Sequence, residues 1–201
     1  MRPDPNPGGP LTDPSAGPIL LGLARAAIAA RLGRAPAVDE SAPWLAAPGA
    51  CFVTLTLDGR LRGCIGSLEP HRSLLADVTH NARAAAFSDR RFPPLSAAEL
   101  PRTRIEVSLL SASEPLEAGS EAELVARLRP GVDGLILAWD GHRGTFLPQV
   151  WEQLPDPQQF LNRLKQKAGL PVSFWSPQVT VRRYGVTAWT EPADRPMEVI
   201  R

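Results

Sequence analysis

The sequence predicts an α+β fold in which a mostly antiparallel sheet is flanked by helices. Asp58-Gly59 follows the apolar, β-branched run FVTLTL (52–57) and precedes RLRGCIG, and Asp140-Gly141 separates residues 135–139 from residues 143–147. Asp-Gly between two strand-like runs is the strongest short-range signal of a hairpin. Other segments repeat apolar residues at helical spacing. These segments follow no regular strand–helix–strand alternation, so antiparallel pairing is expected rather than a parallel sheet.

Proline content marks the N-terminal boundary of the folded part. Six prolines fall within residues 3–18, so residues 1–17 are expected to form a flexible tail. Residues 18–191 are expected to form the folded domain, and residues 192–201 a C-terminal tail.

Helix and hairpin signals alternate in the first half of the domain. The expected elements are a helix over 19–32, strands over 52–57 and 60–66, a helix over 73–87 and a strand over 104–110. Gly33 ends the first helix and Ser73 caps the second. Ser96 and Glu99 are spaced as a capping box and predict one short helical turn. The last of these strands alternates strictly between apolar and polar residues, which predicts one buried face.

The second half begins with another capping box, formed by Ser120 and Glu123. The expected elements are a short helix from Ser120, a hairpin over 135–147, a helix from Asp156 to about Ala168 and one or two strands within 178–190. Asp156 caps its helix with Pro157 in the first position, and Gly169 ends it.

The first hairpin determines which side chains share a face. A two-residue turn places Cys64 opposite Val53 and Arg62 opposite Leu55. Arg62 and Cys64 then lie on one face, because side chains alternate along a strand. Cys51 would lie diagonal to Cys64, about 7–8 Å away, which is at or beyond disulfide reach. We therefore expect no disulfide.

Composition excludes several classes of function. The 22 Lys and Arg residues are nearly balanced by 21 Asp and Glu residues, which argues against nucleic-acid or membrane-surface binding through bulk charge. No apolar run reaches the roughly 18 residues that a membrane-spanning helix needs. The N-terminus lacks the apolar core of a signal peptide, so a cytoplasmic protein is expected. Two cysteines are too few for a disulfide scaffold or a zinc knuckle.

Six short strings occur in order along the chain: FVTL (52–55), LRGCIG (61–66), DRRFPPL (89–95), EVSLL (106–110), FLPQV (146–150) and KAGL (167–170). Their order and spacing resemble the AMMECR domain family, whose prokaryotic members are called AmmeMemoRadiSam system protein A. The resemblance extends from about Leu20 to Glu191. The chain departs from the family pattern at Arg90, where proline is usual, and in its short Asp58-Gly59 turn.

The resemblance implies that residues 18–191 form an α+β domain of two closely packed subdomains, a larger sheet-and-helix part and a smaller β-rich part. It also implies Memo-like and radical-SAM proteins as partners, because genes for both accompany the family; the Memo-type protein looks like an extradiol dioxygenase. The family has no established reaction, and the resemblance assigns neither a cofactor nor an oligomeric state.

LRGCIG makes the best case for chemistry. Cys64 is the candidate nucleophile or group carrier, Arg62 would stabilise its thiolate, and Glu106 is the candidate acid or base. Cys64 could equally be a small buried hydrophobic residue, and Glu106 part of a solvated strand face. Six further residues are candidates for ligand binding: Gly63, Gly66, His80, Asp89, Arg91 and Ser108.

Structural roles compete with these assignments. In the alternative interpretation the glycines serve sheet packing, Asp89 caps a turn and Arg91 pairs with a carboxylate. The histidines, His71, His80 and His142, lack the spacing of metal ligands, so no metal site is expected.

Three hypotheses remain open, and the sequence does not decide whether the protein is an enzyme. The first is an enzyme or substrate-positioning component of a modification pathway with Memo-like and radical-SAM partners. The second is a non-catalytic adaptor for a peptide, a nucleic acid or a partner protein. In the third, the motifs only determine the fold. An exposed Cys64 sulfur in a charged cleft favours the first, and a sealed one favours the second.

Overall fold

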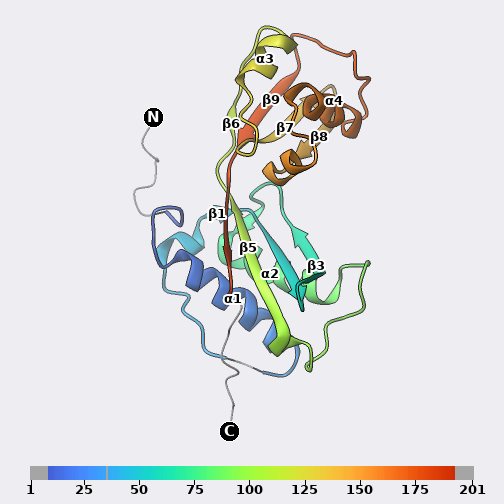
Figure 1. Cartoon of the computed structure of the whole chain (residues 1–201). Coiled ribbons are helices and arrows are strands. Elements are labelled where there is room, and N and C mark those ends of the chain that lie inside the picture. Colours follow the sequence, from blue (N-terminus) through green and yellow to red (C-terminus); the bar gives the residue numbers. More distant parts are fainter. Residues whose placement is uncertain (1–8, 35, 193–201) are drawn as a thin grey trace. The chain divides into compact units, whose positions relative to one another are not determined.

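The computed structural model describes residues 9–34 and 36–192. Within them the chain forms four α-helices and three antiparallel sheets, which confirms the α+β prediction (Figure 1). Contacts divide the chain into two compact units. Unit 1 holds Met1–Leu110 and Thr187–Arg201, and unit 2 holds Ser111–Val186.

Unit 1 is built on a four-stranded sheet with the order β10-β5-β2-β3. Its main elements are α1 (Ala16–Arg31), β2 (Cys51–Leu57), β3 (Arg60–Gly66), α2 (Leu74–Phe87), β5 (Thr103–Leu110) and β10 (Val186–Thr190). Its short elements are η1 (Pro43–Ala46), β1 (Pro48–Gly49), β4 (Arg72–Ser73) and η2 (Leu100–Arg102). Helices α1 and α2 pack against each other and against the sheet face that bears Val53, Leu55 and Ile105 (Figure 1). This face is the core of unit 1.

Local signals account for the helix boundaries of unit 1. Ser73 caps α2 as predicted, since its hydroxyl accepts a hydrogen bond from the Ala76 N–H at 3.3 Å. Helix α1 begins at Ala16, before the predicted start, and so includes Pro18 in its first turn. Gly33, with φ of +79°, follows its end as predicted.

The turn of the first hairpin has the predicted type I′ backbone. Asp58 and Gly59 have φ of 49° and 78°, and both values lie in the left-handed region that this turn requires. Beside the turn, Leu57 pairs with Arg60, as a two-residue turn predicts.

Beyond the turn, a β-bulge overturns the predicted register. The register shifts next to Leu55, so Arg62 becomes an extra residue on β3. Cys64 consequently pairs with Thr54 and not with Val53. Val53 faces the core and Thr54 faces away from it, so the bulge moves Cys64 to the other face of the sheet. The regular alternation that predicted a shared face for Arg62 and Cys64 is lost.

Unit 2 contains a second four-stranded sheet, with the order β6-β9-β7-β8 and a core of its own. Its elements are β6 (Glu114–Pro115), α3 (Glu121–Arg127), β7 (Gly134–Trp139), β8 (His142–Phe146), η3 (Pro148–Glu152), α4 (Pro157–Lys167) and β9 (Thr180–Tyr184). The predicted hairpin is present, and it keeps the register of a two-residue turn throughout, from Trp139 paired with His142 to Leu135 paired with Phe146.

The helices of unit 2 begin at the predicted caps. The side chains of Ser120 and Asp156 accept hydrogen bonds from backbone N–H groups in the first turns of α3 and α4. In the core, the rings of Trp151 and Phe160 stack with centroids 3.7 Å apart. Trp151 is therefore a core residue of unit 2.

Residues 1–8 of the predicted N-terminal tail and 193–201 of the predicted C-terminal tail lie outside the described residues. Residues 9–17 are described, and the last two of them, Ala16 and Gly17, belong to α1. In the described part of the N-terminal segment, Asp13 accepts a hydrogen bond from Trp44 Nε1 at 2.9 Å. Within the described ranges, no helix combines the length and the apolar character needed to cross a membrane.

Candidate functional site

Polar side chains occupy the face of the unit 1 sheet that points away from α1 and α2. Thr54 pairs with Cys64 on one side and with Glu106 on the other. These three side chains form one row across β3, β2 and β5, which we call the polar row. Thr54 Oγ1 donates a hydrogen bond to Cys64 Sγ at 3.3 Å, and Cys64 and Glu106 are half-buried. The structure thus places two predicted catalytic residues in one row, together with Thr54, which the sequence analysis missed.

Two hydroxyl groups hold the Glu106 carboxylate. Ser108 Oγ donates to it at 3.3 Å and Thr190 Oγ1 donates to it at 3.0 Å. Ser108, a predicted ligand-binding residue, is only 5% exposed, so its contact with Glu106 is its main role in this structure. Thr190 comes from the distant strand β10, and no local pattern in the sequence indicates its contact with Glu106.

Arg62 is bound to Glu99 and not to the Cys64 thiol. Its Nε lies 2.9 Å from Glu99 Oε1 and its Nη2 lies 3.3 Å from Oε2, a two-point ion pair. This pair lowers the pKa of Glu99 to about 2, with help from the Ser96 N–H. Among the described residues, the buried Nη1 of Arg62 has no hydrogen-bond partner. The predicted capping box thus supplies the carboxylate that holds the bulged arginine.

The loop after α2 binds the main chain of Cys64. Asp89 Oδ2 accepts a hydrogen bond from the Cys64 N–H at 2.9 Å, and Arg91 Nη2 donates to the Cys64 carbonyl at 3.4 Å. Arg91 also makes a two-point ion pair with Asp89, at 3.0 and 2.6 Å. Hydrogen bonds from Arg91 and from the Cys64 N–H hold the pKa of Asp89 well below its usual range. Since β3 is an edge strand, these side chains satisfy backbone groups that no strand pairs.

The two predicted glycines of LRGCIG allow close packing. A Cβ at Gly63 would overlap the carbonyl of Ala85 on α2, and a Cβ at Gly66 would overlap the Phe52 ring. These contacts agree with the packing interpretation of both glycines. His80 is exposed on α2, the helix that covers the opposite face of the sheet, so the structure does not bring it to the polar row.

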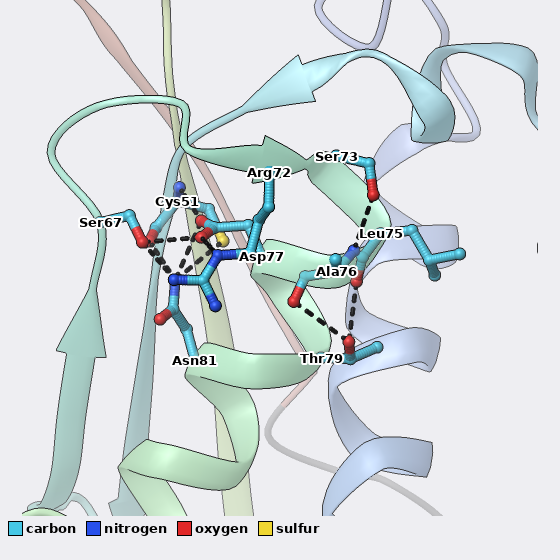
Figure 2. A network of polar contacts seen from close by, with 9 residues as sticks. All are labelled: Cys51, Ser67, Arg72, Ser73, Leu75, Ala76, Asp77, Thr79 and Asn81. Atoms are coloured by element: carbon cyan, nitrogen blue, oxygen red, sulfur yellow. Dashed lines mark hydrogen bonds and ion pairs between the residues drawn. The ribbon is translucent and has the colours of Figure 1, made fainter.

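A buried polar network lies at the other end of the hairpin. Figure 2 shows Asp77 and Asn81 pointing from α2 toward Cys51 and Ser67. Asp77 is fully buried; it accepts hydrogen bonds from the Cys51 N–H at 2.9 Å and from Ser67 Oγ at 2.6 Å, and its carboxylate lies 3.4 Å from Arg72 Nε. Asn81 donates to Asp77 and to the Cys51 carbonyl. The sequence analysis missed this network, although Asp77 and Asn81 lie one helical turn apart on the buried stripe of α2.

The two cysteines occupy different environments. Both are free, as predicted. Cys51 is fully buried, and its pKa is raised strongly by burial and further by the charge of Asp77. Cys64 lies half-buried on the opposite face of the sheet. Only Cys64 is therefore placed for thiol chemistry.

An open cavity of about 340 Å³ lies near the turn of the β2–β3 hairpin. Its lining residues are Leu57, Asp58, Arg60, Leu61 and Arg62. In the described ranges, no three His, Cys, Asp or Glu side chains are grouped so as to hold a metal ion.

Comparisons with known proteins agree with the motifs. The AMMECR1 family model matches residues 21–189. A protein of Methanothermobacter thermautotrophicus is 44% identical over 135 residues, which are 66% of this chain and 70% of the relative. A protein of Aeropyrum pernix is 38% identical over 190 residues, covering 91% of this chain and 82% of the relative. The crystal structure of the uncharacterized protein PH0010 from Pyrococcus horikoshii matches with a TM-score of 0.72 at 32% identity, covering 87% of this chain and 91% of that one. The chain belongs to the AMMECR1 family.

Proposed function

We propose that the protein is an enzyme, or a substrate-positioning component, of a modification pathway in which Memo-like and radical-SAM proteins take part, and that its substrate binds at the polar row. One observation carries the proposal: a half-buried thiol lies in register with a hydroxyl and a carboxylate on the sheet face away from the helices. A thiol acts as a nucleophile or carries a transferred group, and a nearby carboxylate supplies an acid or a base. The resemblance to the AmmeMemoRadiSam proteins supplies the partners.

The spacing of the row fits a substrate that lies across it. Neighbouring strands are about 4.8 Å apart, so groups two strands apart are separated by about 10 Å. That distance is too long for direct proton transfer between the Cys64 sulfur and the Glu106 carboxylate. A substrate lying over Thr54 would contact both groups, with Cys64 attacking at one end and Glu106 exchanging a proton at the other.

We assign Arg62 a structural part in this proposal, in place of the thiolate-stabilising part that the sequence suggested. Its guanidinium is occupied by Glu99, and its backbone forms the bulge that places Cys64 on the polar face. Arg62 therefore supports the site by holding β3 in the bulged register.

Replacing Cys64 with Ala, or Glu106 with Gln, in the producing organism tests this function. We expect both variants to lose the same modified metabolite or macromolecule, detected by mass spectrometry against the wild type. Cys51→Ala is the matched control, because it removes the buried thiol and leaves the polar row intact. Unchanged profiles in both site variants would contradict the proposal.

A second candidate function is a non-catalytic adaptor. It is favoured because several motif residues make contacts that stabilise the fold. Arg62 pairs with Glu99, Asp89 binds the Cys64 main chain, and Gly63 packs against α2. An adaptor should retain the Memo-like or radical-SAM partner in co-purification when Cys64 is replaced by Ala. If no partner co-purifies with the wild type, and Arg62→Ala behaves as the wild type, this candidate fails.

A further inference from the structure

Arg91 is a cation that contacts the Cys64 main chain. Its Nη2 lies 3.4 Å from the Cys64 carbonyl oxygen, and its partner Asp89 binds the Cys64 N–H at 2.9 Å. The pKa of Arg91 is raised mainly by its hydrogen bonds to Asp89 and to a smaller extent by the charge of a Cys64 thiolate. The guanidinium therefore lies beside the main chain of the residue that carries the thiol.

One edge of this guanidinium is available to a ligand. Nε and Nη2 are bound to Asp89, whereas Nη1 makes no hydrogen bond within the part of the chain that the structure describes. The Arg91 side chain is 56% exposed, in contrast to 5% for Asp89. Within the same described residues, Arg62 also has an unbound Nη1, but its side chain is 9% exposed and this atom is buried, so it offers no solvent-facing edge.

We propose that Arg91 binds an anionic group of the substrate, a carboxylate or a phosphate, and so directs Cys64 toward anionic electrophiles. This inference rests on the proposed function, because it names the class of substrate that the same thiol attacks. A planar guanidinium with free N–H donors suits carboxylate and phosphate oxygens. The ion pair with Asp89 fixes the direction in which Nη1 projects.

The other charges around the thiol do not cancel this preference. The Asp89 carboxylate is occupied by Arg91 and by the Cys64 N–H. Glu106 lies two strands away and accepts hydrogen bonds from Ser108 and Thr190. Because Asp89 offsets part of the Arg91 charge and the site is partly solvated, the expected selectivity is modest, on the order of fivefold.

A pair of thiol reagents that differ in charge tests the inference. Iodoacetate is anionic and iodoacetamide is neutral, and each reacts in the same way: the Cys64 thiolate forms a C–S bond with the methylene carbon as the C–I bond breaks, iodide leaves, and the thiol proton passes to solvent. The measured quantity is the ratio of the iodoacetate rate to the iodoacetamide rate at Cys64, followed by peptide mass spectrometry. We expect this ratio to be about fivefold higher in the native protein than in the same chain unfolded in urea. Raising the salt concentration should reduce the difference.

Variants of the loop assign the effect to one residue. Arg91→Gln should lower the ratio about fivefold, toward that of the unfolded chain, and Arg91→Lys should retain most of it. Arg90→Gln is the matched control, because Arg90 is an exposed arginine in the same loop without these contacts. If Arg91→Gln does not fold, the salt dependence of the wild type and the Arg91→Lys ratio decide the question.

The outcomes separate the two proposals. A Cys64 that reacts with both reagents but shows the same ratio in the wild type, Arg91→Gln and the unfolded chain overturns the role of Arg91 and leaves the proposed function standing. A Cys64 that reacts with neither reagent in the native protein overturns both.

Discussion

The two Asp-Gly hairpins of the molecule have the same type of turn, but the second strand of the β2–β3 hairpin contains one extra residue. Asp58 and Gly59 have φ of 49° and 78°, and Asp140 and Gly141 have φ of 43° and 79°. In each hairpin a glycine of the second strand approaches the backbone of a helix. The β7–β8 hairpin is regular along its length, whereas β2–β3 contains a bulge at Arg62.

This difference shows what the bulge contributes. In the regular register Cys64 would lie opposite Val53, a fully buried core residue. In the bulged register it lies opposite Thr54 on the polar face. One extra residue therefore converts a core position into an accessible one, as bulges near functional sites do in other sheets.

Replacing the glycine that approaches a helix in each hairpin, Gly63 or Gly144, should lower the unfolding free energy by different amounts. Gly63→Ala should cost about 3 kcal/mol of unfolding free energy, because the new methyl group overlaps the Ala85 carbonyl and α2 must move. Gly144→Ala should cost about 1–2 kcal/mol, since its Cβ would lie 2.9 Å from the Leu164 carbonyl oxygen. Urea unfolding measures both values.

Gly22→Ala is the control for this pair of variants. Gly22 lies within α1, and a Cβ there meets nothing within 4 Å, so alanine should stabilise the protein by about 0.5–1 kcal/mol. Equal losses from Gly63→Ala and Gly144→Ala would contradict the difference that we draw between the hairpins.

The ion pair that holds the bulge should make the stability of unit 1 depend on pH. Glu99 has its pKa lowered to about 2 from an ordinary value of 4.5, so the pair contributes fully above pH 4.5 and its contribution is lost as the pH falls toward 2. Glu99→Gln should cost about 1–2 kcal/mol at pH 7 and should flatten the acid loss of stability. Urea midpoints measured from pH 7 to pH 2 provide the comparison.

Glu114→Gln is the matched control for the acid series. Glu114 pairs with Arg183 in unit 2, but its side chain is 60% exposed, and exposed pairs contribute little. An acid profile of Glu99→Gln that coincides with the wild type would show that the Arg62 pair does not stabilise the bulged hairpin.

The smallest expected effects are the losses of unfolding free energy on replacing either cysteine with alanine. Cys51→Ala should cost about 1 kcal/mol, because Cys51 is fully buried and packs in the core of unit 1. Cys64→Ala should cost under about 0.5 kcal/mol, because the side chain is half-buried and the hydrogen bond that its sulfur accepts from Thr54 Oγ1 is weak. Thermal unfolding compares the two, and a larger loss from Cys64→Ala would place that thiol in the core.

Local chemistry predicted the elements of the fold. The caps Ser73, Ser120 and Asp156 and the two Asp-Gly turns lie where sequence rules place them, because each depends on neighbours within a few residues.

The polar row was only partly predictable. Arg62, the extra residue of the bulge, pairs with Glu99, which lies 37 positions away, and no periodicity in the sequence signals such a contact. Gly63 inside a strand was the available hint, since glycine there often accompanies a bulge. The Asp77–Asn81 network had a clearer signal, namely two polar residues on an apolar helical stripe.

Labelling of the native wild-type protein with iodoacetamide, followed by peptide mapping, shows whether the bulge makes the Cys64 thiol accessible. If the bulge places Cys64 on the accessible face, one thiol per chain reacts, at Cys64, and Cys51 reacts only after the protein is unfolded in urea. Modification of Cys51 as fast as Cys64, or a Cys64 that stays unmodified until unfolding, would contradict the account.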